Sequence, residues 1–224
     1  MFLSWIMGFV LGCLHAMDPD HLAAVSTFVS KNPSKKASAR FALDWGIGHS
    51  LSLLALTVVV LTFGTRLGSF EQRALETAVG VTLIGLGLWR LVDFFQERYN
   101  IHSHLHRDLR HQQHEHFHVH REGSGNAHHD HSHLAGFVGL LHGAAGSARF
   151  LVLIPIALIG SLSGALTYVV FFSCGVVLSM IAYAVFLGQL FQRSERLSML
   201  QGMYRPMTGL TSLGLGIYWI ATTL

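Results

Sequence analysis

His15-Ala16-Met17-Asp18-Pro19-Asp20-His21 places two histidines and two aspartates in the middle of the first apolar segment of the chain. Ionisable side chains cost roughly 2.5–3.5 kcal/mol each at the centre of a membrane-spanning helix, so they usually mark a functional site. Imidazole and carboxylate groups together suit a divalent transition metal. A polar helix end facing water is the alternative, but more apolar sequence follows directly. The stretch therefore predicts a metal site within a membrane.

The composition supports a membrane protein. Of the 224 residues, 51% are hydrophobic and only 12% are charged, which excludes an ordinary soluble domain. The formal charge of +3 is too small to suggest nucleic acid as a partner. Cys13 and Cys174 both lie in apolar stretches, so no disulfide scaffold is expected. The first apolar segment carries carboxylates and no basic leader, so we expect it to remain in the mature protein.

The expected fold is an all-α polytopic membrane protein with six transmembrane helices. Each of six apolar stretches approaches the ~20 residues that a helix needs to cross a bilayer. The first is interrupted by Pro19, and the fourth by a small, flexible run that contains Gly143, Gly146 and Ser147. Broken helices in a membrane line enclosed cavities, so both breaks are expected at a translocation path. The stretches are 2–29, 41–63, 74–95, 134–160, 164–191 and 206–223.

The two halves of the chain resemble each other at an offset near 128 residues. Gly48 and Ser52 in the second stretch match Gly175 and Ser179 in the fifth, and the glycine-rich third stretch matches the sixth. Three spans per copy is an odd number, so the second copy must run in the opposite direction through the bilayer. We therefore expect two inverted three-helix repeats, 1–97 and 134–224, and glycine-rich helices that match by chance are the alternative.

The symmetry pairs His15 with His142, but Asp18, Asp20 and His21 have no ionisable counterparts in the second half, and His49 aligns with Val176. The first half is therefore expected to supply most of the donors to a shared cavity.

Positive charges predict the orientation. Without the long polar loop, seven lysines and arginines fall on one side of the six spans and three on the other, so the richer side is expected to be cytoplasmic. Both termini would then lie outside the cell.

The polar segment 98–133 would lie inside the cell. It contains twelve histidines within the 32 residues from His102 to His133, and we expect a disordered, metal-binding cytoplasmic loop. A polar linker that binds metal only incidentally is the alternative. The loop histidines are His102, His104, His106, His111, His114, His116, His118, His120, His128, His129, His131 and His133.

Three motifs resemble those of a known family. The pattern H-x-x-x-x-D-H from His15 to His21 resembles the signature of the nickel/cobalt transporter superfamily, and Gly46-Ile47-Gly48-His49-Ser50 resembles its second motif. The run from Leu141 to Ala148 resembles the UreH-like, NicO-type branch of six-helix proteins. The resemblance implies that His15, Asp20 and His21 are metal ligands or essential path residues, with His49 nearby. The acidic motif of the larger permeases is absent from this chain.

The expected function is transport of divalent transition-metal cations, mainly Ni²⁺ or Co²⁺, in the direction of uptake. The residue chemistry adds Asp18 and His142 to the site. Efflux by proton antiport, a metal sensor without transport, and a thiol-based electron conduit are the alternatives. The expected partners are the bilayer, the metal ions as substrate and cytosolic metallochaperones, in a prokaryotic plasma membrane. We expect no enzymatic activity, no catalytic residues and no catalytic cofactor.

Overall fold

The computed structural model describes residues 2–63, 69–99, 102–107, 113–118, 132–145, 148–159, 161–194 and 198–223. Apart from one short hairpin, the elements within these ranges are helices. The helices are α1 (Phe2–His15), α2 (Pro19–Lys31), α3 (Lys35–Phe63), α4 (Ser69–Tyr99), α5 (Ser132–Ala144), α6 (Ala148–Ile159), α7 (Leu162–Ser194) and α8 (Ser198–Thr223). The strands are β1 (His102–Arg107) and β2 (Gln113–His118).

The first apolar stretch is broken where the sequence predicts. Helix α1 ends at His15, and α2 begins at Pro19, bent by 60° from α1. Proline has no N–H and a fixed φ, so it is well suited to the first position of a helix and poorly suited to its interior. Asp18 caps α2 with an extended backbone, at φ −60° and ψ 141°. The backbone N–H groups of Met17 and Asp18 donate to the carbonyls of Leu14 and His15 and close the turn.

The fourth apolar stretch is also divided into two helices, with α5 ending at Ala144 and α6 beginning at Ala148. The sequence predicts Gly143 at this break, but the structure places it in the last turn of α5. A Cβ at Gly143 would overlap the carbonyl oxygen of His49, so this glycine permits close packing against α3. Gly146 and Ser147 lie outside the described residues.

The six predicted spans are supported in part. In the part of the chain that the structure describes, α3, α4 and α7 are long and apolar enough to cross a membrane by themselves, and the bent pair α1–α2 meets the same criteria together. Helix α8 has 26 residues but is not among the helices that meet these criteria. Helix α5 is apolar but too short to cross alone. An arrangement of six spans therefore remains a prediction.

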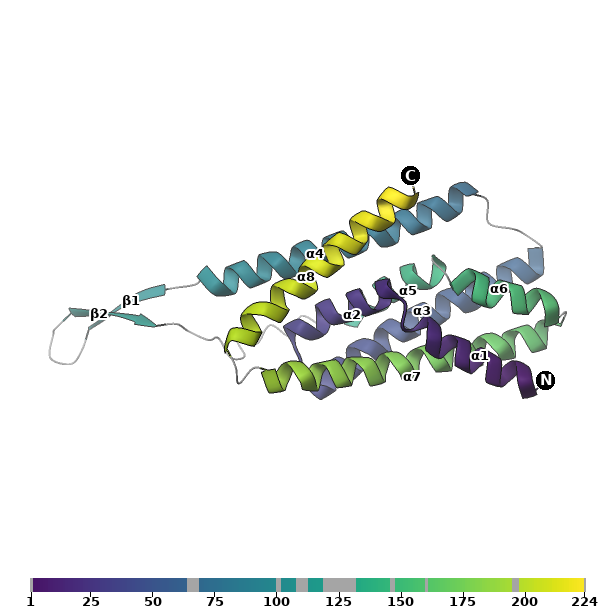
Figure 1. Ribbon diagram of the computed structural model, residues 1–224, viewed down its shortest axis with the longest axis horizontal. Helices are drawn as coiled ribbons and strands as arrows, with labels where there is room; N and C mark the ends of the chain where they lie inside the picture. Colours follow the sequence, from purple (N-terminus) through teal and green to yellow (C-terminus); the bar gives the residue numbers. More distant parts are fainter. Residues whose placement is uncertain are drawn as a thin grey trace.

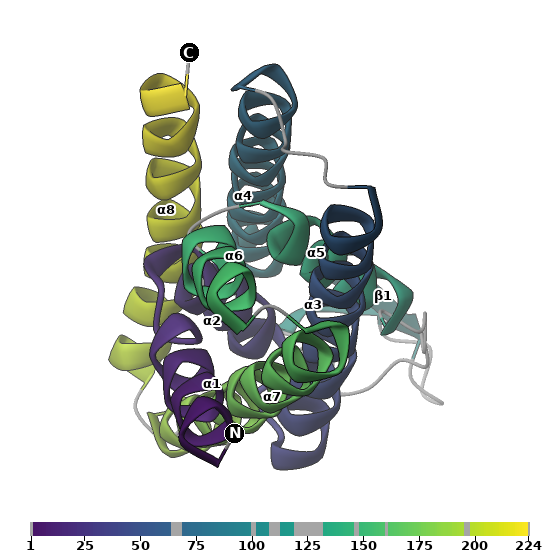
Figure 2. The ribbon, with the colours of Figure 1, turned by 90° about the vertical axis from the view of Figure 1, so that its right-hand side faces the viewer.

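The helices form two groups. Helices α4 and α8 lie side by side along most of their length (Figure 1), and Figure 2 shows them on one side of the molecule, with α1, α3 and α7 on the other. Helices α2, α5 and α6 lie between the two groups (Figure 2). Helix α3 packs against both α5 and α7, and α1 packs against α7.

Glycines allow these close contacts, and the contacts recur between the halves. A Cβ at Gly12 would overlap the carbonyl oxygen of Phe172, and a Cβ at Gly139 would overlap that of Trp45. Gly12 and Gly139 are 127 positions apart, as are Trp45 and Phe172. The contact of α1 with α7 therefore has a counterpart in the contact of α5 with α3.

A second set of glycines joins α4 to α8. Each of Gly80 and Gly216 lies against the carbonyl of the other, and the same holds for Gly87 and Gly209. The hydroxyl of Ser212 donates to the carbonyl of Leu83 between these two crossings, over 2.9 Å.

The disorder expected for the loop 98–133 stays a prediction, and a short hairpin is described within it. Strands β1 and β2 form an antiparallel hairpin, in which His102, His104 and His106 are registered opposite His118, His116 and His114. Histidine alternates with other residues in both strands, and this period of two matches an extended strand. His111, His120, His128, His129 and His131 lie outside the described residues.

The glycine contacts predict that replacement by alanine destabilises the protein at some glycines and is tolerated at others. We expect Gly139→Ala to lower the free energy of unfolding by about 1–3 kcal/mol, because the added Cβ must displace the backbone of α3. Gly214→Ala in α8 is the matched control, because a Cβ there meets nothing within 4 Å. Thermal unfolding in detergent measures both, and equal stability of the two variants would contradict the packing described.

Candidate metal centre

Four histidines from four helices gather beside the break between α1 and α2. His15 ends α1, His21 lies in the first turn of α2, His49 lies in α3, and His142 lies near the end of α5. All four side chains are at most 2% exposed. The ring centroid of His21 lies 4.5 Å from that of His15, 5.3 Å from that of His49 and 5.8 Å from that of His142. The structure therefore brings together the four histidines that the sequence places outside the polar loop.

Three of these histidines are spaced like the ligands of one ion. His15, His21 and His49 each offer a nitrogen, and the three nitrogens lie within 4.8 Å of one another. The Nε2 atoms of His15 and His49 face each other at 3.3 Å. Two imidazoles on a tetrahedral metal, at about 2.0–2.1 Å from the ion, would have nitrogens roughly 3.3 Å apart. A cation between these rings would therefore require little movement of either.

Hydrogen bonds to the Nδ1 atoms orient three of the four rings. The Nδ1–H of His15 donates to Oδ2 of Asp18 over 2.8 Å, and the Nδ1–H of His21 donates to the carbonyl of His15 over 3.0 Å. The Nδ1–H of His142 donates to the carbonyl of Val138 over 2.9 Å. A partner on one ring nitrogen fixes the tautomer and leaves the other nitrogen free to accept a metal. Consistent with this, Nε2 of His142 is buried and has no hydrogen-bond partner among the described residues.

The two aspartates form a second ligand group that shares His21. Asp18, Asp20 and His21 offer ligand atoms within 4.8 Å of one another. Asp20 is buried, and its Oδ1 accepts the backbone N–H of His21 over 3.1 Å. The side chain of Asp18 is 30% exposed, so this group reaches from the buried histidines toward the surface of the protein.

Trp45 also lies in this region, although it belongs to none of the sequence motifs. Its side chain is fully buried, and its ring centroid lies 4.9 Å from that of His21, 5.1 Å from that of His49 and 5.9 Å from that of His142. Trp45 precedes His49 by one helical turn, so the spacing on α3 could have indicated it. The fold was needed to show that its ring also meets His21 and His142.

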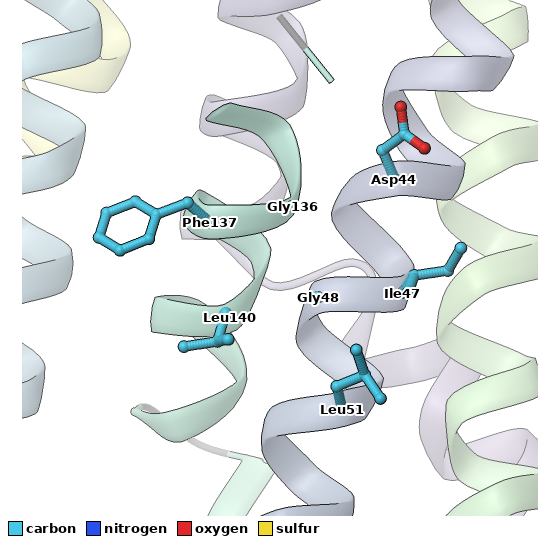
Figure 3. Close-up of a pocket in the computed structure, with 7 residues that line it drawn as sticks. All are labelled: Asp44, Ile47, Gly48, Leu51, Gly136, Phe137 and Leu140. Atoms are coloured by element: carbon cyan, nitrogen blue, oxygen red, sulfur yellow. The ribbon is translucent and has the colours of Figure 1, made fainter. Parts of the chain in front are cut away.

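A groove between α3 and α5 lies apart from the histidines. It encloses about 300 Å³, and Asp44 is its single ionisable lining residue (Figure 3). Oδ2 of Asp44 lies 3.8 Å from Nε of Arg40 on the same helix. The groove is otherwise lined by apolar residues and two glycines, namely Ile47, Gly48, Leu51, Gly136, Phe137 and Leu140. Since it holds no histidine and one carboxylate, the groove offers a poor ligand set for a transition metal.

The two cysteines are not joined by a disulfide in the structure. Cys13 and Cys174 are both free thiols, and Sγ of Cys13 lies 3.7 Å from the carbonyl oxygen of Gly175.

Comparisons with known proteins agree with the motifs. The family model described as "High-affinity nickel-transport protein" matches residues 1–194. "Urease accessory protein UreH" of Bacillus sp. (strain TB-90) is 29% identical over 214 residues, which cover 96% of this chain and 89% of that protein.

Two plant proteins are also similar. "Chloroplast protein FOR GROWTH AND FERTILITY 2" and "Chloroplast protein FOR GROWTH AND FERTILITY 1" of Arabidopsis thaliana are 27% and 28% identical to this chain, and each alignment covers 94% of it. The chain spans only 54% and 56% of their lengths. No solved structure matches the chain.

The contact between Asp18 and His15 predicts a measurable effect on metal affinity. We expect Asp18→Asn to weaken binding of Ni²⁺ about 10–100-fold, because a neutral amide replaces the carboxylate that accepts the hydrogen bond from His15. Glu71→Gln, at an exposed acidic position in the first turn of α4, is the control. Isothermal titration of protein with the loop histidines replaced by asparagine gives the affinity of the core alone. Unchanged affinity in Asp18→Asn would remove Asp18 from the site.

Proposed function

The chain belongs to the family of high-affinity nickel-transport proteins, and we propose that it carries divalent transition-metal cations, Ni²⁺ first, through the cluster of His15, His21, His49 and His142. As a member of this family it is an integral membrane transport protein and not an enzyme. The observation that carries the proposal is the convergence of four buried imidazoles from four helices at a helix break. Burial of four such groups inside a membrane protein is energetically costly, so their presence indicates a function.

The donor set favours transport over permanent storage. The cluster offers imidazole nitrogens, with carboxylates of Asp18 and Asp20 beside them. Such a set binds Ni²⁺ and Co²⁺ without the stronger hold of thiolates, so the ion can also leave. The same donors accept Zn²⁺, and we propose Ni²⁺ as the main substrate on the strength of the family.

We propose that the chain is built from two inverted repeats of three spans, each beginning with a broken helix. The equivalent glycine contacts of α1 with α7 and of α5 with α3 support this arrangement. In transporters of this plan, the substrate binds where the repeats meet near the middle of the bilayer. His15 and His142, which are 127 positions apart, would then be symmetry mates at that interface.

The proposed direction is uptake. A membrane potential of about 100 mV, negative inside, contributes roughly 4.6 kcal/mol to the inward movement of a divalent cation. This corresponds to accumulation by about three orders of magnitude without another coupling ion. Efflux would have to oppose this potential by exchange for protons.

The proposed location is a prokaryotic plasma membrane. The distribution of lysines and arginines supports an orientation with both termini outside and 98–133 in the cytoplasm. In that position the histidine-rich loop would hold arriving metal and hand it to cytosolic metallochaperones.

Flux through proteoliposomes tests the site. We expect His15→Ala, Asp20→Asn and His21→Ala each to abolish Ni²⁺ entry into vesicles that contain a metal-quenched dye, because each removes a donor from the group beside the break. Glu71→Gln serves as the control for charge removal. Normal flux in all three variants would refute the assignment of the site. Binding of Ni²⁺ without flux in the native protein would instead indicate a sensor.

The same vesicles test direction. We expect Ni²⁺ entry to increase with an inside-negative potential and to need no pH gradient, since the charge of the ion itself supplies the driving force. Entry that depends on a pH gradient and ignores the potential would contradict uptake and favour proton-coupled efflux.

The loop histidines should modulate transport without being essential. We expect replacement of all twelve by asparagine to preserve flux at saturating Ni²⁺, because the four core histidines remain in place. Radioactive nickel uptake into vesicles measures this, and complete loss of flux would place the essential site on the loop.

A further inference from the structure

Two aromatic side chains occupy equivalent positions beside the histidines. Trp45 in α3 and Phe172 in α7 are 127 positions apart, and both side chains are fully buried. The carbonyl of Trp45 lies against Gly139 of α5, and that of Phe172 lies against Gly12 of α1. Each aromatic residue is therefore fixed at the crossing of its own helix with a broken helix of the other half.

Both rings contact the proposed ligands. Trp45 is nearly parallel to the ring of His49, at an interplanar angle of 26°, and it meets His21 edge-on at 74°. The ring of Phe172 lies 5.5 Å from that of His15. The histidine cluster therefore has one aromatic ring from each half against it.

The two rings lie toward opposite ends of the helices. Helices α3 and α7 are antiparallel, because Gly46 lies against Val177 whereas Ser38 lies against Gly188 (Figure 1). Trp45 is one turn closer than His49 to the start of α3, which is about 6 Å along the axis. Val176 is the counterpart of His49 in the second half. Phe172 lies one turn closer to the start of α7 than Val176 does. Because α3 and α7 are antiparallel, their starts lie at opposite ends of the helix pair. The ring of Trp45 therefore lies on one side of the cluster along the helix axes, and the ring of Phe172 lies on the other.

We propose that Trp45 and Phe172 are the two gates of the transport path, Trp45 closing the cluster toward the start of α3 and Phe172 closing it toward the start of α7. This inference rests on the proposed function. A hydrated dication cannot pass a closed apolar constriction, because the constriction excludes water. In the structure both rings are fully buried, and the four histidines between them are at most 2% exposed. Rotation of one ring would open one side while the other stays shut.

The arrangement also explains the difference between the halves. The tryptophan contacts three histidines and the phenylalanine contacts one. Opening at Trp45 therefore disturbs His21, His49 and His142 together, whereas opening at Phe172 disturbs His15 alone. We infer that movement of Trp45 accompanies release of the ion, and that movement of Phe172 accompanies its entry.

Removal of both gates tests the proposal. In Trp45→Ala/Phe172→Ala we expect Ni²⁺ flux through proteoliposomes to lose saturation and to rise linearly with concentration, because a continuous path replaces alternating access. Trp45→Phe should keep saturable flux. The matched control is Phe171→Ala/Trp219→Ala, which removes one partly exposed neighbour of Phe172 and one tryptophan of α8. Saturable flux in a double alanine variant that still binds Ni²⁺ would overturn the proposal, and so would loss of binding, since the rings would then be walls of the site.

The single variants give a second test if the double variant does not fold. Native membrane vesicles are prepared in both orientations and loaded with radioactive nickel, and a chelator that cannot cross the membrane is added outside. We expect Trp45→Ala and Phe172→Ala to expose the bound metal from opposite sides. Exposure from the same side, or from neither, would overturn the gates. If the gates fail while His15→Ala still abolishes flux, the transport site stands without them.

Discussion

Two imidazoles six residues apart cannot face one ion from a continuous α-helix, because they point about 120° away from each other. The break at Ala16–Asp18 removes this obstacle. Pro19 cannot continue α1 but starts α2 well, and the 60° bend brings the ring of His21 to within 4.5 Å of that of His15. The carbonyl of His15, at the end of α1, accepts the Nδ1–H of His21 as well as the backbone N–H of Asp18. The break thus places a backbone carbonyl where it also orients a candidate ligand.

The rest of the fold holds this break in place. Thr208 of α8 and Ser30 of α2 share a hydrogen bond of 3.1 Å, and Ser30 also accepts Nε–H of Arg90 from α4 over 2.9 Å. Helix α2 is therefore attached to the α4–α8 pair, while α1 is attached to α7 through glycine. A movement between these two groups would act directly at the break. This connects the packing of helices far from the histidines to the geometry of the cluster itself.

Much of the site could be predicted from sequence, because histidine and aspartate are conspicuous in an apolar stretch. The break at Pro19 follows from the chemistry of proline, and His142 follows from its match to His15 in the repeat. Trp45 could not be selected in this way, since a tryptophan in an apolar helix is ordinary and its contact with His142 depends on how α5 crosses α3. Gly143 was assigned to a break because glycine is flexible, whereas its small size against His49 is what the packing uses. For the loop 98–133, composition predicts disorder, whereas the alternation of histidine with other residues is compatible with the strands β1 and β2.

X-ray absorption at the nickel edge shows whether the core histidines bind the transported ion. The sample is protein with all twelve loop histidines replaced, loaded with one equivalent of Ni²⁺, so that His15, His21, His49 and His142 are the remaining imidazoles. We expect the outer-shell scattering of at least three imidazoles, and a loss of part of it in His49→Ala. A spectrum of oxygen and water ligands alone would contradict it.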